Sequence, residues 1–260
     1  MSHVDVNGAR LWVEECGAGP AVVFVHGGLG DLRLWERQAW ALATRFRCVR
    51  YDLRFYGRST GRPGAEWSQV DDLIGVLDAL GIDRAALVGL SLGGGLALDA
   101  ALAHPERVWA LAHVAGGVSG LGIDPYTAEQ EAAYDAALDR GDLEAAMDID
   151  FAIWAPLGAD EMLRELWRAT PDARGMPDGA QQLPGPPAHE RLGDVSVPTL
   201  VVIATHDPPD LRARGETVAR DVQRARLVEV DSDHYVTLRE AARITRLLDE
   251  FLCSAAPLEE

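Results

Sequence analysis

Lysine is absent from this chain of 260 residues, so all 24 of its lysine-plus-arginine positions are arginine. Without a lysine amine, the chain cannot form a Schiff base or use a Ser–Lys pair. Cysteine is scarce, since the chain has only Cys16, Cys48 and Cys253. These three lie far apart, are odd in number and have no metal-ligand spacing, so we expect buried, reduced thiols.

A positive charge excess and a long apolar run are also missing. The formal net charge is −17, which repels nucleic acid and anionic membranes, so we expect neither as a partner. The longest nearly uncharged run, Ala85 to Leu98, is too short to span a bilayer. The first residues show neither a basic start nor an apolar segment, so we expect no signal peptide and a cytoplasmic protein.

The pattern of apolar segments predicts one α/β domain. Asn7-Gly8 separates two alternating runs, which is typical of a β-hairpin. Helical patterns then alternate with strand-like runs, as expected for a mostly parallel sheet of eight strands with helices on both faces. The runs are Ala21–Val25, Arg47–Tyr51, Ala85–Gly89, Val108–Val114, Thr199–Ala204 and Leu227–Val230.

Residues 120–194 follow a different pattern. Three helical segments are followed by a stretch that contains five prolines between Pro171 and Pro187. We predict a helical insertion at 120–194 in a core made of 1–119 and 195–260. Its aromatic residues, Phe151, Trp154 and Trp167, either form a pocket wall or simply pack the small helices together.

The motif Gly89-Leu90-Ser91-Leu92-Gly93 follows a buried strand and opens a helix. G-x-S-x-G in this context indicates a nucleophile elbow, a strained strand-to-helix turn that exposes a serine hydroxyl. Small residues at 89 and 93 let the backbone pass close to the turn. Positive potential at the helix N-terminus favours negative charge that develops beside Ser91.

A serine needs a base, and in this arrangement the chain order is serine, acid, histidine. Asp207 follows the next-to-last predicted strand, and His234 is the only histidine beyond it. Asp210, and more weakly Asp124, are alternative acids. The neighbouring Asp231 and Asp233 are interpreted as turn residues.

An oxyanion needs two backbone donors. One is expected from Leu92, directly after the serine, and the other from the loop His26-Gly27-Gly28, with Gly28 preferred over Leu29. The interpretation we favour for His26 is structural, with its ring bracing this loop by hydrogen bonds.

These motifs, together with Tyr51-Asp52-Leu53-Arg54, Gly57-Arg58-Ser59 and His104-Pro105-Glu106-Arg107-Val108, resemble the α/β-hydrolase superfamily. Within it, the chain is similar to the small bacterial esterase and enol-lactonase branch. The resemblance implies an α/β-hydrolase fold, a cap over the site formed by 120–194, and no cofactor.

Three positions depart from the pattern of that superfamily. Phe55 stands where many relatives have glycine, Asp233 precedes the histidine and His206 precedes the acid. The bulky Phe55 is expected to reshape the pocket edge or the turn. We hypothesise that Asp233 and His206 tune the base, because each adjoins a catalytic partner.

The sequence therefore predicts a serine hydrolase that cleaves an ester or lactone of a small apolar molecule, with Leu29, Phe55, Phe151 and Trp154 against the substrate. C–C bond hydrolysis or perhydrolysis by the same triad, and a non-hydrolytic receptor or cyclase on this scaffold, stay open. No metal site is expected, because the spacing of acidic residues and histidines matches no standard ligand pattern. The sequence does not distinguish a monomer from a homodimer.

Overall fold

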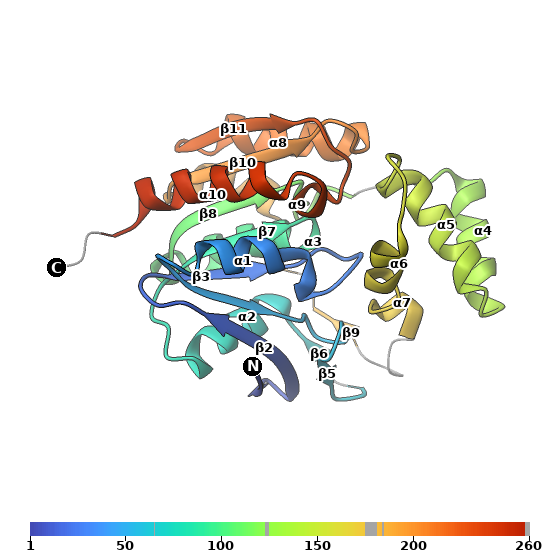
Figure 1. Ribbon diagram of the computed structural model, residues 1–260, viewed down its shortest axis with the longest axis horizontal. Helices are drawn as coiled ribbons and strands as arrows, with labels where there is room; N and C mark the ends of the chain where they lie inside the picture. The colour runs from blue at the N-terminus through green and yellow to red at the C-terminus, as the bar shows by residue number, and fades with distance from the viewer. Residues whose placement is uncertain (65, 123–124, 175–180, 184, 258–260) are drawn as a thin grey trace.

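The computed structural model describes residues 1–257 except 65, 123–124, 175–180 and 184. One sheet runs through it, and Figure 1 shows this sheet with helices in front of and behind it. In spatial order its strands are β1 (Ser2–Val6), β2 (Ala9–Cys16), β4 (Arg47–Tyr51), β3 (Ala21–Val25), β7 (Ala85–Leu90), β8 (Val108–Val114), β10 (Thr199–Ala204) and β11 (Ala225–Val230).

The pairing from β4 to β11 is parallel throughout, whereas β1, β2 and β4 pair antiparallel. The predicted hairpin is confirmed, since Asn7 and Gly8 between β1 and β2 both have positive φ, at 47° and 76°. A ninth strand adds to the predicted eight, because the two-residue β5 (Thr60–Gly61) pairs with β2. A separate small sheet joins β6 (Glu66–Trp67) to β9 (Gln181–Gln182).

Helices cover both faces of the sheet, as predicted. One apolar core includes α1 (Glu36–Leu42) and α10 (Ala241–Ala255), and the other includes α2 (Gln69–Ala79), α3 (Leu92–Ala103) and α8 (Pro209–Asp221). Successive residues of β3 enter alternate cores, which explains why this strand is apolar at every position. Short helical turns complete the core region: η1 (Leu32–Trp35), η2 (Pro105–Arg107), η3 (Ala188–Glu190), η4 (Leu192–Asp194) and α9 (Val236–Arg239).

Several predicted details differ in the structure. Helical spacing at Leu238–Leu252 in the sequence predicts one C-terminal helix, but the structure has two, α9 and α10, because the backbone at Glu240 leaves the helical region. Helical spacing also predicts a helix from about Trp67 to Leu80, and α2 begins two residues later, since the Ser68 side chain caps it by accepting the Asp71 N–H at 3.2 Å. All three cysteines are free thiols, but only Cys48 is buried as expected, since Cys16 is half-buried and Cys253 is exposed.

The described part of the insertion contains four helices numbered α4 to α7, which are α4 (Ala128–Asp139), α5 (Leu143–Trp154), α6 (Glu161–Trp167) and α7 (Pro171–Arg174). In Figure 1 they stand together to one side of the sheet, beyond the ends of β7 and β8. Backbone bonds tie them to the core, with Gly57 N–H donating to Ala169 O at 2.9 Å and His234 N–H donating to Trp154 O at 3.2 Å. Among the described residues, no helix has the length and apolar character needed to cross a bilayer.

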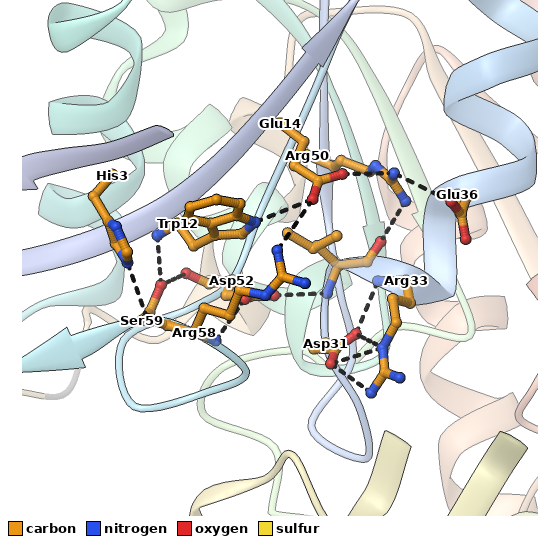
Figure 2. Close-up of polar contacts among 11 residues, drawn as sticks. His3, Trp12, Glu14, Asp31, Arg33, Glu36, Arg50, Asp52, Arg58 and Ser59 are labelled. Atoms are coloured by element: carbon orange, nitrogen blue, oxygen red, sulfur yellow. Dashed lines mark hydrogen bonds and ion pairs between the residues drawn. The ribbon is translucent and has the colours of Figure 1, made fainter. Parts of the chain in front are cut away.

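The loop after β4 is fixed by Asp52, whose surroundings are drawn in Figure 2. The Asp52 carboxylate accepts the N–H of Leu32 at 3.0 Å and the N–H of Arg58 at 2.8 Å, and its carbonyl accepts the Ser59 hydroxyl at 2.7 Å. Burial raises the pKa of Asp52 to about 7, although the two N–H groups that donate to its carboxylate act to lower it. This network supports the turn that places Tyr56 against the cavity described below.

Candidate active site

Ser91 occupies the turn between β7 and α3. Its backbone lies in a strained region at φ 54° and ψ −116°, which is expected only where the surroundings enforce it. A Cβ on Gly89 would lie 2.0 Å from Gly93 O, and one on Gly93 would lie 2.3 Å from Val25 O. The two glycines are therefore required by backbone packing around the serine, as the motif predicts.

Asp207 and His234 meet at the same edge of the sheet. Their parallel strands β10 and β11 are neighbours, so the loops that follow these strands lie side by side. His234 Nδ1 and Asp207 Oδ1 are 2.9 Å apart, and both side chains are buried. This bond fixes the imidazole ring with Nε2 free of the carboxylate. The second oxygen, Asp207 Oδ2, is buried without a hydrogen bond within the described residues.

Of the two alternative acids, the structure describes only Asp210, which is exposed at the start of α8. Asp124 lies outside the described residues. Asp231, interpreted as a turn residue, is exposed, and its Oδ1 lies 2.9 Å from His206 Nε2.

Asp233 is fully buried and links the histidine loop to the insertion. It accepts the Arg239 Nε–H at 2.6 Å and the Leu157 N–H at 3.3 Å. Neither Asp233 nor His206 is hydrogen-bonded to Asp207 or to the His234 ring. Their effect on the base stays a prediction.

A cavity of about 580 Å³ opens at Ser91 and His234. That volume suits a small organic molecule. The wall is largely apolar and includes Leu29, Leu92, Leu96, Val118, Leu121 and Trp154. Ser91 and His234 share this cavity, but the described contacts include no hydrogen bond between them. Such bonds often form only when a substrate is bound.

Gly28 and Leu92 both line the cavity and lie close together. A Cβ on Gly28 would lie 3.9 Å from Leu92 Cβ, and one on Gly27 would lie 3.2 Å from Ser91 Cβ. Leu92 opens α3, so its N–H has no carbonyl one turn earlier to bind. The backbone at Gly28 therefore lies close to the start of α3, and the role of the two N–H groups as oxyanion donors stays a prediction.

His26 braces the adjoining loop, as favoured from the sequence. Its Nδ1 is 2.8 Å from Gly27 O, and its Nε2 accepts the Leu53 N–H at 2.9 Å. Complete burial lowers the pKa of the imidazole to about 4. The neutral ring with the proton on Nδ1 satisfies both bonds, which leaves His26 no role as a base.

The buried His26 should make stability depend on pH. Its pKa is about 4 in the folded state, below the ordinary value of 6.5, so its stabilising effect is complete above pH 6.5 and is lost as pH falls through 4. The stability difference between wild type and His26→Gln should shrink by up to about 3 kcal/mol from pH 7 to pH 4. Urea unfolding at each pH measures it, with circular dichroism confirming that both proteins start folded. A difference independent of pH would contradict this prediction.

One aromatic side chain of the insertion, that of Trp154, contacts His234. The rings of Trp154 and His234 are 4.6 Å apart at 47°. The Trp154 Nε1–H donates to the Tyr126 hydroxyl at 3.2 Å, and that hydroxyl is bonded to the buried Asp150. Asp150 also accepts the Trp167 Nε1–H at 2.5 Å. The carboxylate therefore orients the aromatic wall beside His234.

Two residues expected in the pocket wall lie outside it. Phe55 has a φ of 72° and packs edge-on against Trp67, with ring centroids 5.7 Å apart. Phe151 packs against Tyr235, at 6.2 Å. Leu29 and Trp154 do line the cavity, as expected.

Several polar residues in the cavity wall were not predicted from the sequence. Among them are Tyr56, Asp99, Tyr126 and Arg214, which belong to four separate segments of the chain. No spacing rule connects them. Only Asp99 could have been predicted to lie near the site, because it follows Ser91 by two turns on the helix that Ser91 precedes.

Known proteins share this sequence and architecture. A family model described as the alpha/beta hydrolase fold matches residues 20–241. A 2-hydroxymuconate semialdehyde hydrolase of Pseudomonas putida is 31% identical, with 96% of this chain and 93% of the relative covered. An epoxide hydrolase of Caballeronia sordidicola is 37% identical over 143 residues, which are 53% of this chain and 41% of that protein.

Among solved structures, the enol-lactonase from Burkholderia xenovorans LB400 superposes with a TM-score of 0.71 and is 26% identical. The superposition covers 96% of this chain and 99% of the enol-lactonase. The resemblance drawn from the motifs is thereby confirmed. The chain belongs to the α/β-hydrolase family, and it is an enzyme of the hydrolase class.

Proposed function

We propose that this hydrolase cleaves a carboxylic ester or lactone through an acyl-enzyme on Ser91. The observation that carries the proposal is the buried bond of 2.9 Å between Asp207 and His234, beside a strained serine on the same cavity. A carboxylate that orients an imidazole toward a serine is the arrangement that activates a weak hydroxyl nucleophile.

In the proposed mechanism, His234 takes the Ser91 proton as the oxygen attacks the carbonyl carbon. The N–H groups of Leu92 and Gly28 stabilise the oxyanion, and Asp207 stabilises the imidazolium. The tetrahedral intermediate collapses as the C–O bond of the leaving group breaks, and His234 returns the proton to that oxygen. Water, deprotonated by His234, then releases the acid from Ser91.

The cavity and the relatives favour a small, largely apolar substrate. The apolar wall near Trp154 supports an apolar acyl or alcohol group. The enol-lactonase relative supports hydrolysis of a lactone, in which the ring opens and the acid and alcohol groups remain in one molecule. Epoxide chemistry needs a carboxylate nucleophile at the elbow, so Ser91 argues against carrying over the activity of the epoxide hydrolase relative.

Hydrolysis of a C–C bond is the second candidate. The 2-hydroxymuconate semialdehyde hydrolase relative covers nearly the whole chain and favours it. Such a reaction places the same demands on an oxyanion site and an oriented histidine. Comparing turnover of an aryl ester with that of a ring-cleavage diketone separates the two.

We also propose that α4 to α7 act as a cap over this cavity. Tyr126, Trp154 and Asp172 of the insertion all line it. The Trp154–His234 ring contact supports a direct effect of the insertion on the base.

A serine-directed fluorophosphonate tests the mechanism. We expect one label per chain, found on the Ser91 peptide by mass spectrometry, and parallel loss of turnover of a short 4-nitrophenyl ester. A label on another serine would contradict the assignment. Full ester turnover after complete labelling would contradict the mechanism.

A further inference from the structure

Three arginines are buried in the part of the chain that the structure describes, and two of them have carboxylate partners. Arg50 pairs with Glu14 at 2.7 Å, and Arg54 pairs with Asp72 at 2.7 Å. A buried charge without a partner is costly, so such pairing is the ordinary arrangement. The third, Arg214, is 6% exposed and has no ion pair within the described part of the chain.

Arg214 is also the only arginine in the described wall of the cavity that holds Ser91 and His234. It lies on α8, the helix that follows Asp207, and one Nη2–H is bonded to Gly122 O. A guanidinium has five N–H donors in a planar fork and stays charged in proteins, so this backbone bond leaves most of its capacity unused.

The other charged groups of the wall are acids with partners of their own. The Asp99 carboxyl accepts the Ser119 hydroxyl at 2.6 Å, and burial raises its pKa to about 6. Asp172 accepts the Tyr134 hydroxyl at 3.1 Å. These acids, when ionised, would repel an anionic ligand. Arg214 is therefore the charged group of the described wall that could bind such a ligand.

We propose that Arg214 binds a carboxylate of the substrate, so that the enzyme prefers an ester or lactone with a largely apolar body and one anionic end. This inference rests on the proposed function and narrows its substrate class. Neutralising the buried guanidinium would offset its desolvation cost, and a planar carboxylate matches the fork of donors.

Matched ester pairs test the proposal. On the acyl side, the 4-nitrophenyl monoester of adipic acid is compared with 4-nitrophenyl hexanoate, in which a methyl replaces the carboxylate. On the alcohol side, 4-acetoxybenzoate is compared with phenyl acetate. The wild type should favour the anionic member of at least one pair in kcat/KM. Arg214→Gln should lower that preference ratio by about 10- to 100-fold.

Two further variants separate recognition from structure. Arg214→Lys keeps the charge without the fork and should restore part of the ratio. Arg220→Gln is the matched control, because Arg220 lies on the same helix, is exposed and pairs with Asp221 at 2.7 Å. The control should change neither the ratio nor the turnover of either ester.

Failure of this inference is distinguishable from failure of the proposed function. Turnover of the neutral esters with no preference for either anion, or with a preference unchanged in Arg214→Gln, would overturn the role of Arg214 and leave the serine mechanism standing. If no ester is cleaved, the role of Arg214 is tested by binding instead. Calorimetry then compares the affinity of the protein for 4-phenylbutyrate with its affinity for the neutral amide of that acid. Equal affinity for the two, or the same difference in Arg214→Gln, would overturn the proposal.

Discussion

Replacing Ser91 with alanine should lower kcat/KM for an activated ester by about 10⁴-fold or more. His234→Ala should cost a similar factor, because a serine hydroxyl without its base is a weak nucleophile. The double variant should be no slower than either single variant, since the two groups act as one unit. Steady-state hydrolysis of a short 4-nitrophenyl ester measures all three.

The acid provides a graded comparison in the same assay. Asp207→Asn replaces the carboxylate beside His234 Nδ1 with a neutral amide, which no longer stabilises the imidazolium and can hold the ring in the wrong tautomer. It should cost about 10³- to 10⁴-fold in kcat. Asp210→Asn should have little effect, because Asp210 is exposed at the start of α8. A larger loss of kcat in Asp210→Asn than in Asp207→Asn would identify Asp210 as the acid of the triad.

Ser254→Ala is the control for a serine remote from the cavity, with a hydroxyl bonded to Phe251 O on α10. Activity within about tenfold of wild type in Ser91→Ala would rule out Ser91 as the nucleophile.

Placing a methyl group on Gly93 should damage both stability and activity. The Cβ of an alanine there would lie 2.3 Å from Val25 O and 2.5 Å from His26 O, so it would push apart α3 and the end of β3. Overpacking against backbone cannot be relieved by a rotamer change. We expect Gly93→Ala to lower the free energy of unfolding by about 3 kcal/mol or more. Urea denaturation at pH 7 measures the change.

Activity should fall further than stability alone explains. The loop displaced by Gly93→Ala carries Gly28, so the two proposed oxyanion donors would separate even in molecules that remain folded. Gly193→Ala is the matched control, because nothing lies within 4 Å of its added Cβ and its φ is not in the left-handed range. A Gly93→Ala protein with wild-type stability and turnover would contradict the packing described here.

The sequence alone determined those features that depend on short stretches of chain. The hairpin at Asn7-Gly8, the buried strands and the serine turn each follow from residues within a few positions of one another. The pairing of Asp207 with His234 also followed, because neighbouring parallel strands bring their carboxyl ends to one edge of the sheet.

Only the tertiary structure decided what surrounds that centre. Phe55 and Phe151 are aromatic like Trp154, yet only Trp154 of the three lines the cavity, because the direction of each side chain is set by the neighbours against which it packs. Arg214 is one of 24 arginines, and no local pattern sets it apart. Its burial beside Gly122 arises from contacts between segments distant in sequence, which no periodicity along the chain records.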